Sequence, residues 1–296
     1  MKKILISGSS GFIGSNFQKY IKNKSVRAIH RGEELMIHDE EVIIHLAGKA
    51  HDLKKTASSQ EYYEVNTELT KKVYDAFLAS EATVFITLSS VKAVADEVEG
   101  ELTEQHYPNP ITHYGKSKLL AEQYIFSKEI PEGKRVYVLR PCMIHGPSNK
   151  GNLNLLYKIV SKNIPWPLGT FENKRSFCSI DNLMFIFKEL IEREGIPSGI
   201  YNVADDEPLS TNELIGLIAQ SQNRKQKVWK ISRSLIEKAA RMGDKLYLPL
   251  NSERLHKLTS SYVVSNAKIK NAIGKPLPIS SREGLMKTFQ SFQNKK

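Results

Sequence analysis

The 296-residue sequence predicts an α/β fold, in which a doubly wound parallel sheet is followed by a small, mostly helical C-terminal cap. Short apolar strands alternate with amphipathic helices over the first half of the chain. A glycine-rich turn joins the first strand to the first helix. After Pro147 the alternation of strands and helices gives way to mainly helical patterns and a Pro-rich turn. The length suits one domain of this class with a smaller second unit.

Apolar patterning predicts the individual elements. Strands are expected at short apolar runs: Lys3–Ser7, Val26–His30, Val42–Leu46, Thr83–Leu88, Arg135–Arg140, Ser176–Ile180 and Gly199–Val203. Helices are expected where apolar residues recur at helical intervals: Phe12–Ile21, Glu61–Ala79, His113–Lys128, Asn152–Ser161, Thr211–Gln220, Ser234–Met242, Asn266–Ala272 and Arg282–Phe292. A shortened strand is expected at Leu35–Ile37, because the chain reaches Val42 soon after the second strand. Residues 1–150 and about 176–204 are assigned to the main domain, and about 151–175 and 205–296 to the cap.

The turn after the first strand has the composition of a dinucleotide site. Gly8 permits the tight turn, Gly11 lets the backbone approach a pyrophosphate, and Gly14 lets the helix pack close to the strand. The free N–H groups at the start of the helix, at Phe12 and Ile13, then face the phosphates. Such turns also occur without a ligand, but the position between strand and helix favours a Rossmann-type cofactor site.

A second constellation points to proton transfer. Tyr114 and Lys118 are four residues apart in a helical pattern, so their side chains share one face. An ammonium beside a tyrosine favours the phenolate and should lower a pKa that is ordinarily about 10. Ser90 follows an apolar strand, at the sheet edge where such folds bind ligands. Hydride chemistry with a nicotinamide cofactor is therefore expected, with Tyr114, Lys118 and Ser90 as the catalytic residues.

The Gly-x-x-Gly-x-x-Gly spacing and the Tyr114–Lys118 pair resemble the short-chain dehydrogenase/reductase superfamily, in particular its extended branch of nucleotide-sugar epimerases, dehydratases and reductases. The resemblance covers nearly the whole chain. It implies that the backbone of Leu46, Ala47 and Gly48 lines the cofactor, that Lys118 also holds the nicotinamide ribose, and that Asn66 is structural.

The same resemblance assigns the substrate lobe. It implies that Asn152 and Arg175 hold the diphosphate of a nucleotide sugar, a task that suits a guanidinium fork, although Arg175 also fits a solvated loop. The segments Gly151–Leu153 and Pro165–Gly169 are similar to enzymes of surface-polysaccharide sugar synthesis. The preferred hypothesis is a 4-epimerase of a UDP-hexose or UDP-N-acetylhexosamine. An NADPH-dependent 4-keto reductase of UDP-6-deoxy-hexosamines is the alternative, followed by a dinucleotide-binding protein without turnover.

Two departures from the family pattern bear on the reaction and on the choice of cofactor. Val91 and Lys92 occupy the positions at which the dehydratases carry Asp-Glu, which argues against 4,6-dehydration. The second strand ends without a carboxylate, and Arg31 is placed to meet a 2′-phosphate, which favours NADP, although an exposed loop arginine explains Arg31 equally well. The cofactor is therefore expected to be NAD or NADP. Either Asp39 substitutes for the usual adenine-contacting aspartate, or adenine is bound more openly. His145 is interpreted as a core histidine rather than a substrate contact.

Composition excludes several other classes. The net charge of +11 is spread over the chain without a basic arm, which argues against nucleic-acid binding and favours an anionic substrate. No apolar run approaches the roughly 20 residues that span a bilayer. The 2 cysteines form no ligand or disulfide framework, and the 8 histidines show no metal spacing. A cytoplasmic location is expected, and a homodimer is compatible with the sequence.

Overall fold

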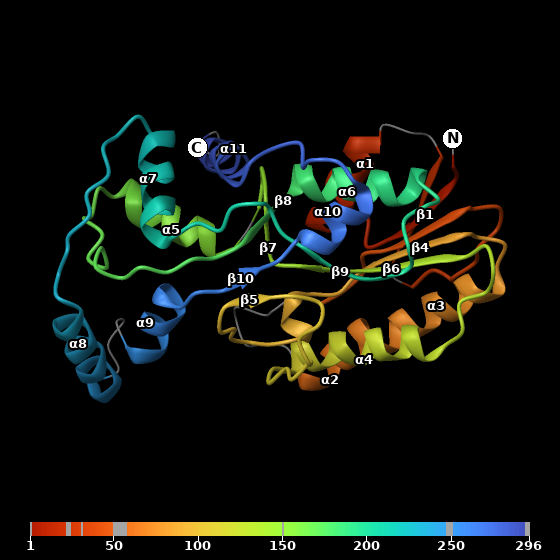
Figure 1. Cartoon of the computed structure of the whole chain (residues 1–296), viewed down its shortest axis with the longest axis horizontal. Helices are drawn as coiled ribbons and strands as arrows, with labels where there is room; N and C mark the ends of the chain where they lie inside the picture. The colour runs from red at the N-terminus through yellow and green to blue at the C-terminus, as the bar shows by residue number, and fades with distance from the viewer. Residues whose placement is uncertain are drawn as a thin grey trace.

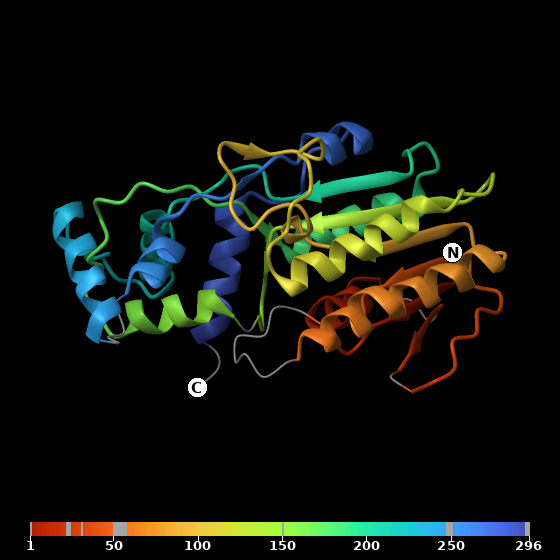
Figure 2. The same ribbon diagram turned by 90° about the horizontal axis from the view of Figure 1, so that it is seen from below.

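The computed structural model describes residues 2–21, 25–30, 32–49, 58–149, 151–246 and 251–293. A sheet lobe and a helical cap lie side by side along the long axis of the molecule (Figure 1). The carboxyl ends of the strands point toward the cap (Figure 2). A ligand bound at this edge of the sheet would therefore lie between the two lobes.

Six parallel strands form the main sheet, in the order β2-β1-β3-β4-β6-β9. The inner strands are buried along their whole length, as expected for a parallel sheet covered on both faces. This topology confirms the predicted doubly wound, Rossmann-type fold. The strands are β1 (Ile4–Ser7), β2 (Val26–Ile29), β3 (Val42–His45), β4 (Val84–Leu88), β6 (Arg135–Pro141) and β9 (Gly199–Val203).

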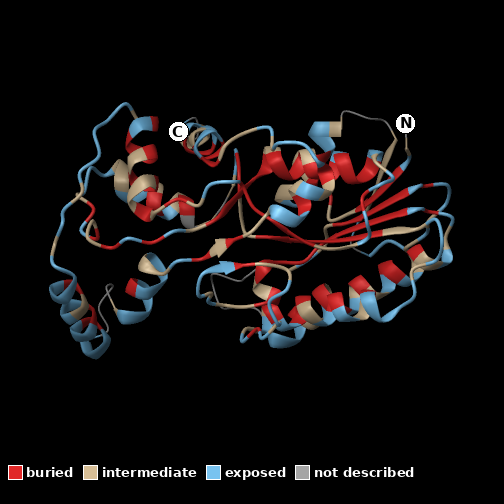
Figure 3. Ribbon diagram, in the orientation of Figure 1, coloured by how far each residue is buried: buried red, intermediate tan, exposed pale blue. Residues whose placement is uncertain are grey.

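Helices cover both faces of the sheet (Figures 1 and 3). One face carries α1 (Phe12–Ile21), α6 (Ile180–Glu192) and α10 (Ala267–Ile273), and the other carries α3 (Leu69–Ala79) and α4 (His113–Ser127). Phe17 of α1 and Phe187 of α6 pack edge to face, with ring centroids 5.6 Å apart. The interior of each layer is thus apolar, and the polar site residues collect at the ends of the strands.

Shorter elements extend the sheet lobe. The helix α2 (Ser59–Tyr63) continues through a π-helical turn (Glu64–Glu68) into α3, and a 3₁₀ turn (Val91–Ala93) follows β4. Two small parallel pairs lie outside the main sheet: β5 (Glu101–Leu102) with β10 (Val263–Val264), and β7 (Met143–His145) with β8 (Phe177–Ser179). The strand predicted at Ser176–Ile180 is β8, so it belongs to the junction with the cap.

The cap has its own apolar core, in which Trp166, Phe171, Ile218 and Phe289 are buried. A capping box of Ser210 and Glu213 starts one of its helices. The cap helices are α5 (Asn152–Ser161), α7 (Thr211–Ser221), α8 (Arg233–Leu246), α9 (Ser252–Thr259) and α11 (Ser281–Gln293). None of the helices in the described ranges is long and apolar enough to cross a membrane.

The structure differs from the sequence-based expectations in several elements. Residues 35–37 form no strand, and Leu35 and Ile37 instead pack partly buried against the core beneath α3 and α4. Asp39 pairs with Lys3 before β1, at the sheet edge opposite the glycine turn, so its assignment to adenine is wrong. The helices α6 and α9 were not predicted. Furthermore, α10 packs on the sheet although its residues fall in the range assigned to the cap.

Candidate active site

The glycine turn forms an open cradle at the end of β1. Gly8 has φ +77°, and a Cβ at this position would clash with the backbone of Ala47. A Cβ at Gly14 would clash with the backbone of Gly8 and Ser9. The close approach of α1 to the turn therefore requires a glycine at this position. By contrast, a Cβ at Gly11 would meet only the carbonyl oxygen of Gly8, at 3.3 Å. The open space at Gly11, beside the free N–H groups of Phe12 and Ile13, fits the pyrophosphate of a dinucleotide.

The loop after β3 forms the second wall of this cradle. The amide of Leu46 donates to the carbonyl of Ser7 (3.0 Å), which fixes Leu46, Ala47 and Gly48 beside the turn. Asn66, fully buried on the π-helical turn, accepts a hydrogen bond from the amide of Lys49 (2.8 Å). It donates to Ser117 Oγ (3.0 Å) on α4. Asn66 therefore connects this wall to the helix that carries Tyr114 and Lys118.

His45 is buried beneath this wall. Its Nδ1 lies 2.6 Å from Ser7 Oγ and its Nε2 lies 3.0 Å from Thr70 Oγ1. Burial, with a smaller contribution from the charge of Lys118, lowers the pKa of His45 to about 3. The ring is therefore neutral at physiological pH and serves to connect β1, β3 and α3.

Ser90 lies at the carboxyl end of β4, and its hydroxyl is near enough to the Tyr114 phenol to lower the pKa of that group. Ser90 accepts a hydrogen bond from the amide of Lys92 (3.2 Å), which fixes its hydroxyl at the start of the 3₁₀ turn. Thr112 caps α4 by accepting from the amide of Gly115 (3.2 Å), so the helix begins immediately before Tyr114. Burial raises the pKa of Tyr114, and the nearby Ser90 hydroxyl offsets only part of this rise. Tyr114 therefore keeps its proton at neutral pH and is arranged as a proton donor.

Lys118 lies between β4 and the cofactor wall. Its Nζ donates to the carbonyl of Leu88 (2.8 Å), and a Cβ at Gly48 would approach that nitrogen to 3.1 Å. Burial lowers the pKa of Lys118 to about 8. The amine is thus near the cofactor cradle, where it fits a ribose hydroxyl. However, the pKa of Tyr114 moves upward, which is opposite to the shift expected from a neighbouring ammonium.

A buried ion pair behind Lys118 was missed in the sequence. Arg140 at the end of β6 donates through Nε to Oε1 of Glu122 (2.9 Å) and through Nη2 to Oε2 of the same carboxylate. Both side chains are 3% exposed. Glu122 follows Lys118 by one helical turn, and its charge raises the pKa of Lys118 against the effect of burial. The four-residue spacing of Lys118 and Glu122 was the one signal in the sequence that the two charges interact, and it does not reveal Arg140 as the partner of Glu122.

Of the two predicted substrate residues, the structure describes the side chain of Arg175 but not that of Asn152. Arg175 is half-buried between short bridges to Leu209 and Tyr262, and its Nη1 donates to the carbonyl of Lys257 (2.8 Å). Asn152 begins α5, and its side chain lies outside the described part of the structure. Arg31 also lies outside the described residues. The structure thus brings together the glycine turn, Ser90, Tyr114 and Lys118.

A carboxylate does stand at the end of β2. The Oε2 atom of Glu33 accepts a hydrogen bond from the amide of His30 (2.9 Å), the first residue after the strand. The sequence pattern missed it because Glu33 lies three residues beyond the position at which a carboxylate is usually sought. The argument for NADP from a missing carboxylate is therefore weaker than the sequence suggested.

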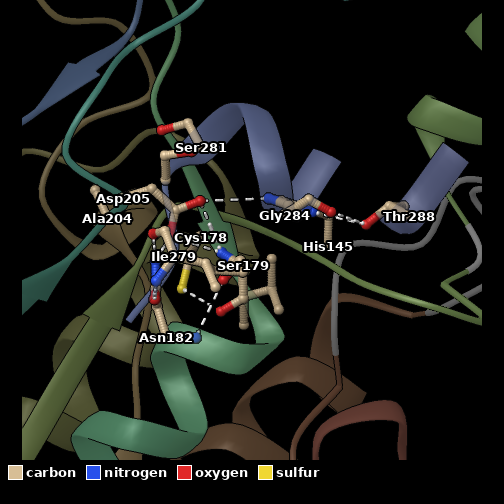
Figure 4. Close-up of polar contacts among 12 residues, drawn as sticks. His145, Cys178, Ser179, Asn182, Ala204, Asp205, Ile279, Ser281, Gly284 and Thr288 are labelled. Carbon is tan, nitrogen blue, oxygen red and sulfur yellow. Dashed lines mark hydrogen bonds and ion pairs between the residues drawn. The ribbon is translucent and has the colours of Figure 1, made fainter. Parts of the chain in front are cut away.

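His145 lies in a buried polar cluster and not on a free surface (Figure 4). Its Nδ1 lies 2.9 Å from Thr288 Oγ1, and its Nε2 lies 3.4 Å from Asp205 Oδ2. Asp205 also accepts hydrogen bonds from the amide of Ser179 (3.0 Å) and from Nδ2 of Asn182 (2.7 Å). The cluster joins β7, β8 and α6 to α11, which confirms the interpretation of His145 as a core histidine.

Comparison with known proteins identifies the family. Residues 4–204 match the sequence model of the NAD dependent epimerase/dehydratase family. The chain belongs to this family. It is accordingly an NAD(P)-dependent enzyme of the epimerase and reductase type, as the resemblance implied.

Relatives with curated names include epimerases and a reductase. The chain is 29% identical to a UDP-glucose 4-epimerase of Vibrio cholerae, over 98% of this chain and 95% of the relative. It is 26% identical to the N-acetyl-alpha-D-glucosaminyl-diphospho-ditrans,octacis-undecaprenol 4-epimerase of Escherichia coli O157:H7, over 75% and 73% of the two chains. A GDP-6-deoxy-D-mannose reductase of Pseudomonas aeruginosa is 23% identical, over 74% and 79%.

Solved structures of the family have the same fold. A UDP-glucuronic acid 4-epimerase from Bacillus cereus in complex with NAD superimposes with a TM-score of 0.73 at 19% identity, and each chain is covered to 99%. The enzyme RMD from Pseudomonas aeruginosa, complexed with NADPH, gives a TM-score of 0.75 at 19% identity over 100% of both chains. At these identities the match establishes the fold and not the substrate.

Proposed function

We propose that the chain is a UDP-sugar 4-epimerase that acts on a UDP-hexose or UDP-N-acetylhexosamine for surface-polysaccharide precursors. The observation that carries the proposal is the placement of Ser90, Tyr114 and Lys118 together at the carboxyl end of β4, the sheet edge that faces the glycine cradle. The similarity to a UDP-glucose 4-epimerase over nearly the whole chain supports the same reaction.

Each residue of the site has a distinct role in this proposal. Bound NAD supplies the redox chemistry at C4 of the sugar. The phenolate form of Tyr114 would accept the proton of the C4 hydroxyl when that carbon is oxidised, and the resulting phenol would return the proton to the C4 oxygen when the keto group is reduced. Ser90 holds that oxygen by hydrogen bonding. Lys118 binds the ribose of the cofactor, and Arg175 binds the substrate diphosphate. Val91 and Lys92 supply no carboxylate, so the site lacks the pair with which the dehydratases eliminate water.

The alternative is a 4-keto reductase that uses NADPH. A reductase exchanges its cofactor in every turnover, whereas an epimerase gains from keeping it bound. The similarity to a GDP-6-deoxy-D-mannose reductase supports this alternative, and Glu33 beside the end of β2 favours NAD and therefore the epimerase. A binding protein without turnover is the third candidate, which the intact Ser90, Tyr114 and Lys118 argue against.

The 4-epimerase and the 4-keto reductase can be distinguished by whether the cofactor stays bound or is consumed. We expect the purified protein to carry bound NAD and to interconvert a UDP-hexose pair at C4 without an added reductant. Incubation with UDP-glucose and with UDP-N-acetylglucosamine, followed by separation of the products, checks this expectation. If neither sugar yields an epimer and NADPH is consumed on a UDP-4-keto-6-deoxy sugar, the chain is the reductase.

The two lobes should respond separately to mutation. Gly11→Val should abolish cofactor binding, because the side chain would fill the open part of the cradle. Arg175→Ala should weaken UDP-sugar binding by about tenfold or more, since a charged hydrogen bond is worth roughly 1.5–3 kcal/mol. Titration calorimetry with NAD and with UDP tests both variants. A loss of the same ligand in both would contradict the division into cofactor and substrate lobes.

A further inference from the structure

Helix α8 of the cap carries an apolar face that the described part of the chain leaves exposed. The side chains of Leu235, Met242 and Leu246 are 60%, 58% and 61% exposed. With the exposed Ala239 they recur at spacings of four, three and four residues, so they form one stripe along the helix. A different face of α8 packs into the cap core through Ile236. The apolar stripe of Leu235, Ala239, Met242 and Leu246 is therefore additional to the face that folding buries.

A basic stripe runs beside the apolar stripe. Lys238, Arg241 and Lys245 are exposed and recur at spacings of three and four residues, so they share the neighbouring face of the helix. None of these three side chains forms an ion pair with another residue in the described ranges. The charges of the basic stripe therefore face solvent, where an anionic partner can reach them.

The two carboxylates of α8 are engaged on another side of the helix. Glu237 pairs with Arg233 at 3.0 Å. Asp244 accepts hydrogen bonds from the amide and the hydroxyl of Ser252, at the start of α9 (2.9 and 2.5 Å). Glu237 and Asp244 are seven residues apart and share a face, which by helical geometry is opposite the apolar stripe. The exposed border of the apolar stripe is therefore formed by cations.

The segment that leads into α8 has the same character. Trp229 is exposed, and its backbone amide donates to the carbonyl of Trp166 (2.8 Å), which fixes this segment on the cap. Residues 224–245 contain eight Lys or Arg and two acidic residues, so this part of the surface is strongly positive. Figures 1 and 2 both show α8 at the end of the long axis opposite the sheet lobe. The cap therefore ends in a basic surface with exposed apolar and aromatic side chains.

This surface fits a lipid bilayer better than a protein partner. Exposed apolar side chains bordered by Lys and Arg, with a Trp nearby, are typical of helices that lie in the interface of a bilayer with anionic headgroups. With 14 residues, α8 is too short to span a bilayer and would lie in the plane of the interface. One face of such a helix, about 21 Å by about 10 Å, offers roughly 200 Å², well below the about 800 Å² per partner of a stable protein interface. Protein interfaces are also depleted of lysine.

We propose that α8 docks the enzyme on an anionic phospholipid surface. The apolar stripe enters the boundary between headgroups and acyl chains, and the basic stripe binds the headgroup phosphates. This inference goes beyond the proposed function and does not depend on it, because docking requires no sugar chemistry. Arg175 donates to the carbonyl of Lys257 on α9, the helix that follows α8 and bonds to it through Ser252 (2.8 Å between Arg175 Nη1 and the carbonyl). Docking would therefore place the substrate lobe at the lipid surface.

Vesicle flotation of the whole chain tests this inference. The wild type should float with vesicles of phosphatidylcholine and phosphatidylglycerol, bind pure phosphatidylcholine weakly, and be released by salt, since salt screens the attraction. Leu235→Gln with Met242→Gln should lower the vesicle affinity about tenfold or more, because two apolar side chains no longer leave water. Lys238→Gln with Arg241→Gln should lower the affinity for anionic vesicles by about the same factor.

Matched variants in the sheet lobe provide the controls. Leu120→Gln with Phe126→Gln removes two exposed apolar side chains from α4. Lys72→Gln with Lys128→Gln removes two exposed cations, one from α3 and one from the end of α4. Both control proteins should bind vesicles like the wild type. Every substituted side chain is exposed, so all four variants should keep the wild-type circular dichroism and melting temperature.

Three results would overturn the inference. A wild type that does not float with anionic vesicles would exclude lipid docking. Equal losses in the α8 variants and in their controls would make binding a property of overall charge or hydrophobicity and not of α8. An oligomer that dissociates in Leu235→Gln with Met242→Gln, without vesicle binding by the wild type, would assign the apolar stripe to a contact between copies of the chain. Failure to epimerise soluble UDP-sugars would contradict only the proposed function, because flotation is measured without substrate.

Discussion

Tyr114→Phe should lower turnover by roughly 10² to 10⁴, the range for removing a positioned acid or base. Burial raises the pKa of the Tyr114 phenol, which lies beside Ser90, so the wild-type group carries a transferable proton at neutral pH. Phenylalanine keeps the ring, which packs edge to face against Tyr62 at 6.3 Å between centroids. Stability and cofactor affinity should therefore change little.

Tyr63→Phe is the control for this variant. The Tyr63 hydroxyl is exposed and bonds to Nδ1 of His113 (3.0 Å), one residue before Tyr114 on the same helix. Losing that hydroxyl removes a neighbouring phenol without touching the reacting pair, so turnover should stay near the wild-type value. Steady-state rates for both variants, with thermal melting and NAD titration, provide the measurement. A Tyr114→Phe protein that binds cofactor and retains nearly full turnover would exclude Tyr114 from proton transfer.

The sheet was predictable from sequence because its signal is local. Each inner strand is a short apolar run, as in Val42–His45 and Val84–Leu88. The helix α6 was missed although Ile180–Glu192 is longer than a typical strand and its apolar residues recur at helical intervals. Its start is marked by Ser179, which caps the helix by accepting from the amide of Asn182 (3.1 Å).

The error over residues 35–39 has a different origin. A family pattern led to the expectation of a third strand there, but the segment is too short to add a strand beyond β2 and instead folds beneath it. Arg27 of β2 pairs with Glu40 and donates to the carbonyl of Met36, which directs this segment along the amino end of the sheet. These contacts depend on residues that are distant in sequence, so local periodicity does not reveal them.

The site was predictable as a set of residue types but not as an electrostatic arrangement. Spacing placed Tyr114 and Lys118 on one helical face, and the structure agrees. Spacing did not reveal that the Lys118 amine bonds to Leu88, nor that burial dominates the pKa of both groups. Desolvation depends on what covers a group in three dimensions, and this information is absent from a local motif.

Glu122→Gln should lower the free energy of unfolding by about 3–5 kcal/mol, the usual cost of removing one partner from a buried ion pair. The change leaves the Arg140 guanidinium at the end of β6 without a countercharge, in a place where both side chains are 3% exposed. It also removes the negative charge that raises the pKa of Lys118, so that pKa should fall further below about 8.

Urea unfolding of Glu122→Gln, of the double variant Glu122→Gln with Arg140→Met, and of Glu237→Gln tests this expectation. The double variant should recover part of the loss, because no buried charge is then left unpaired. Glu237 pairs with Arg233 at 3.0 Å on the exposed surface of α8, and its variant should lose less than about 1 kcal/mol. Equal losses in Glu122→Gln and Glu237→Gln would mean that the buried pair contributes no more than a surface one. In that case Glu122 would not be what fixes the end of β6 against the helix of Tyr114 and Lys118.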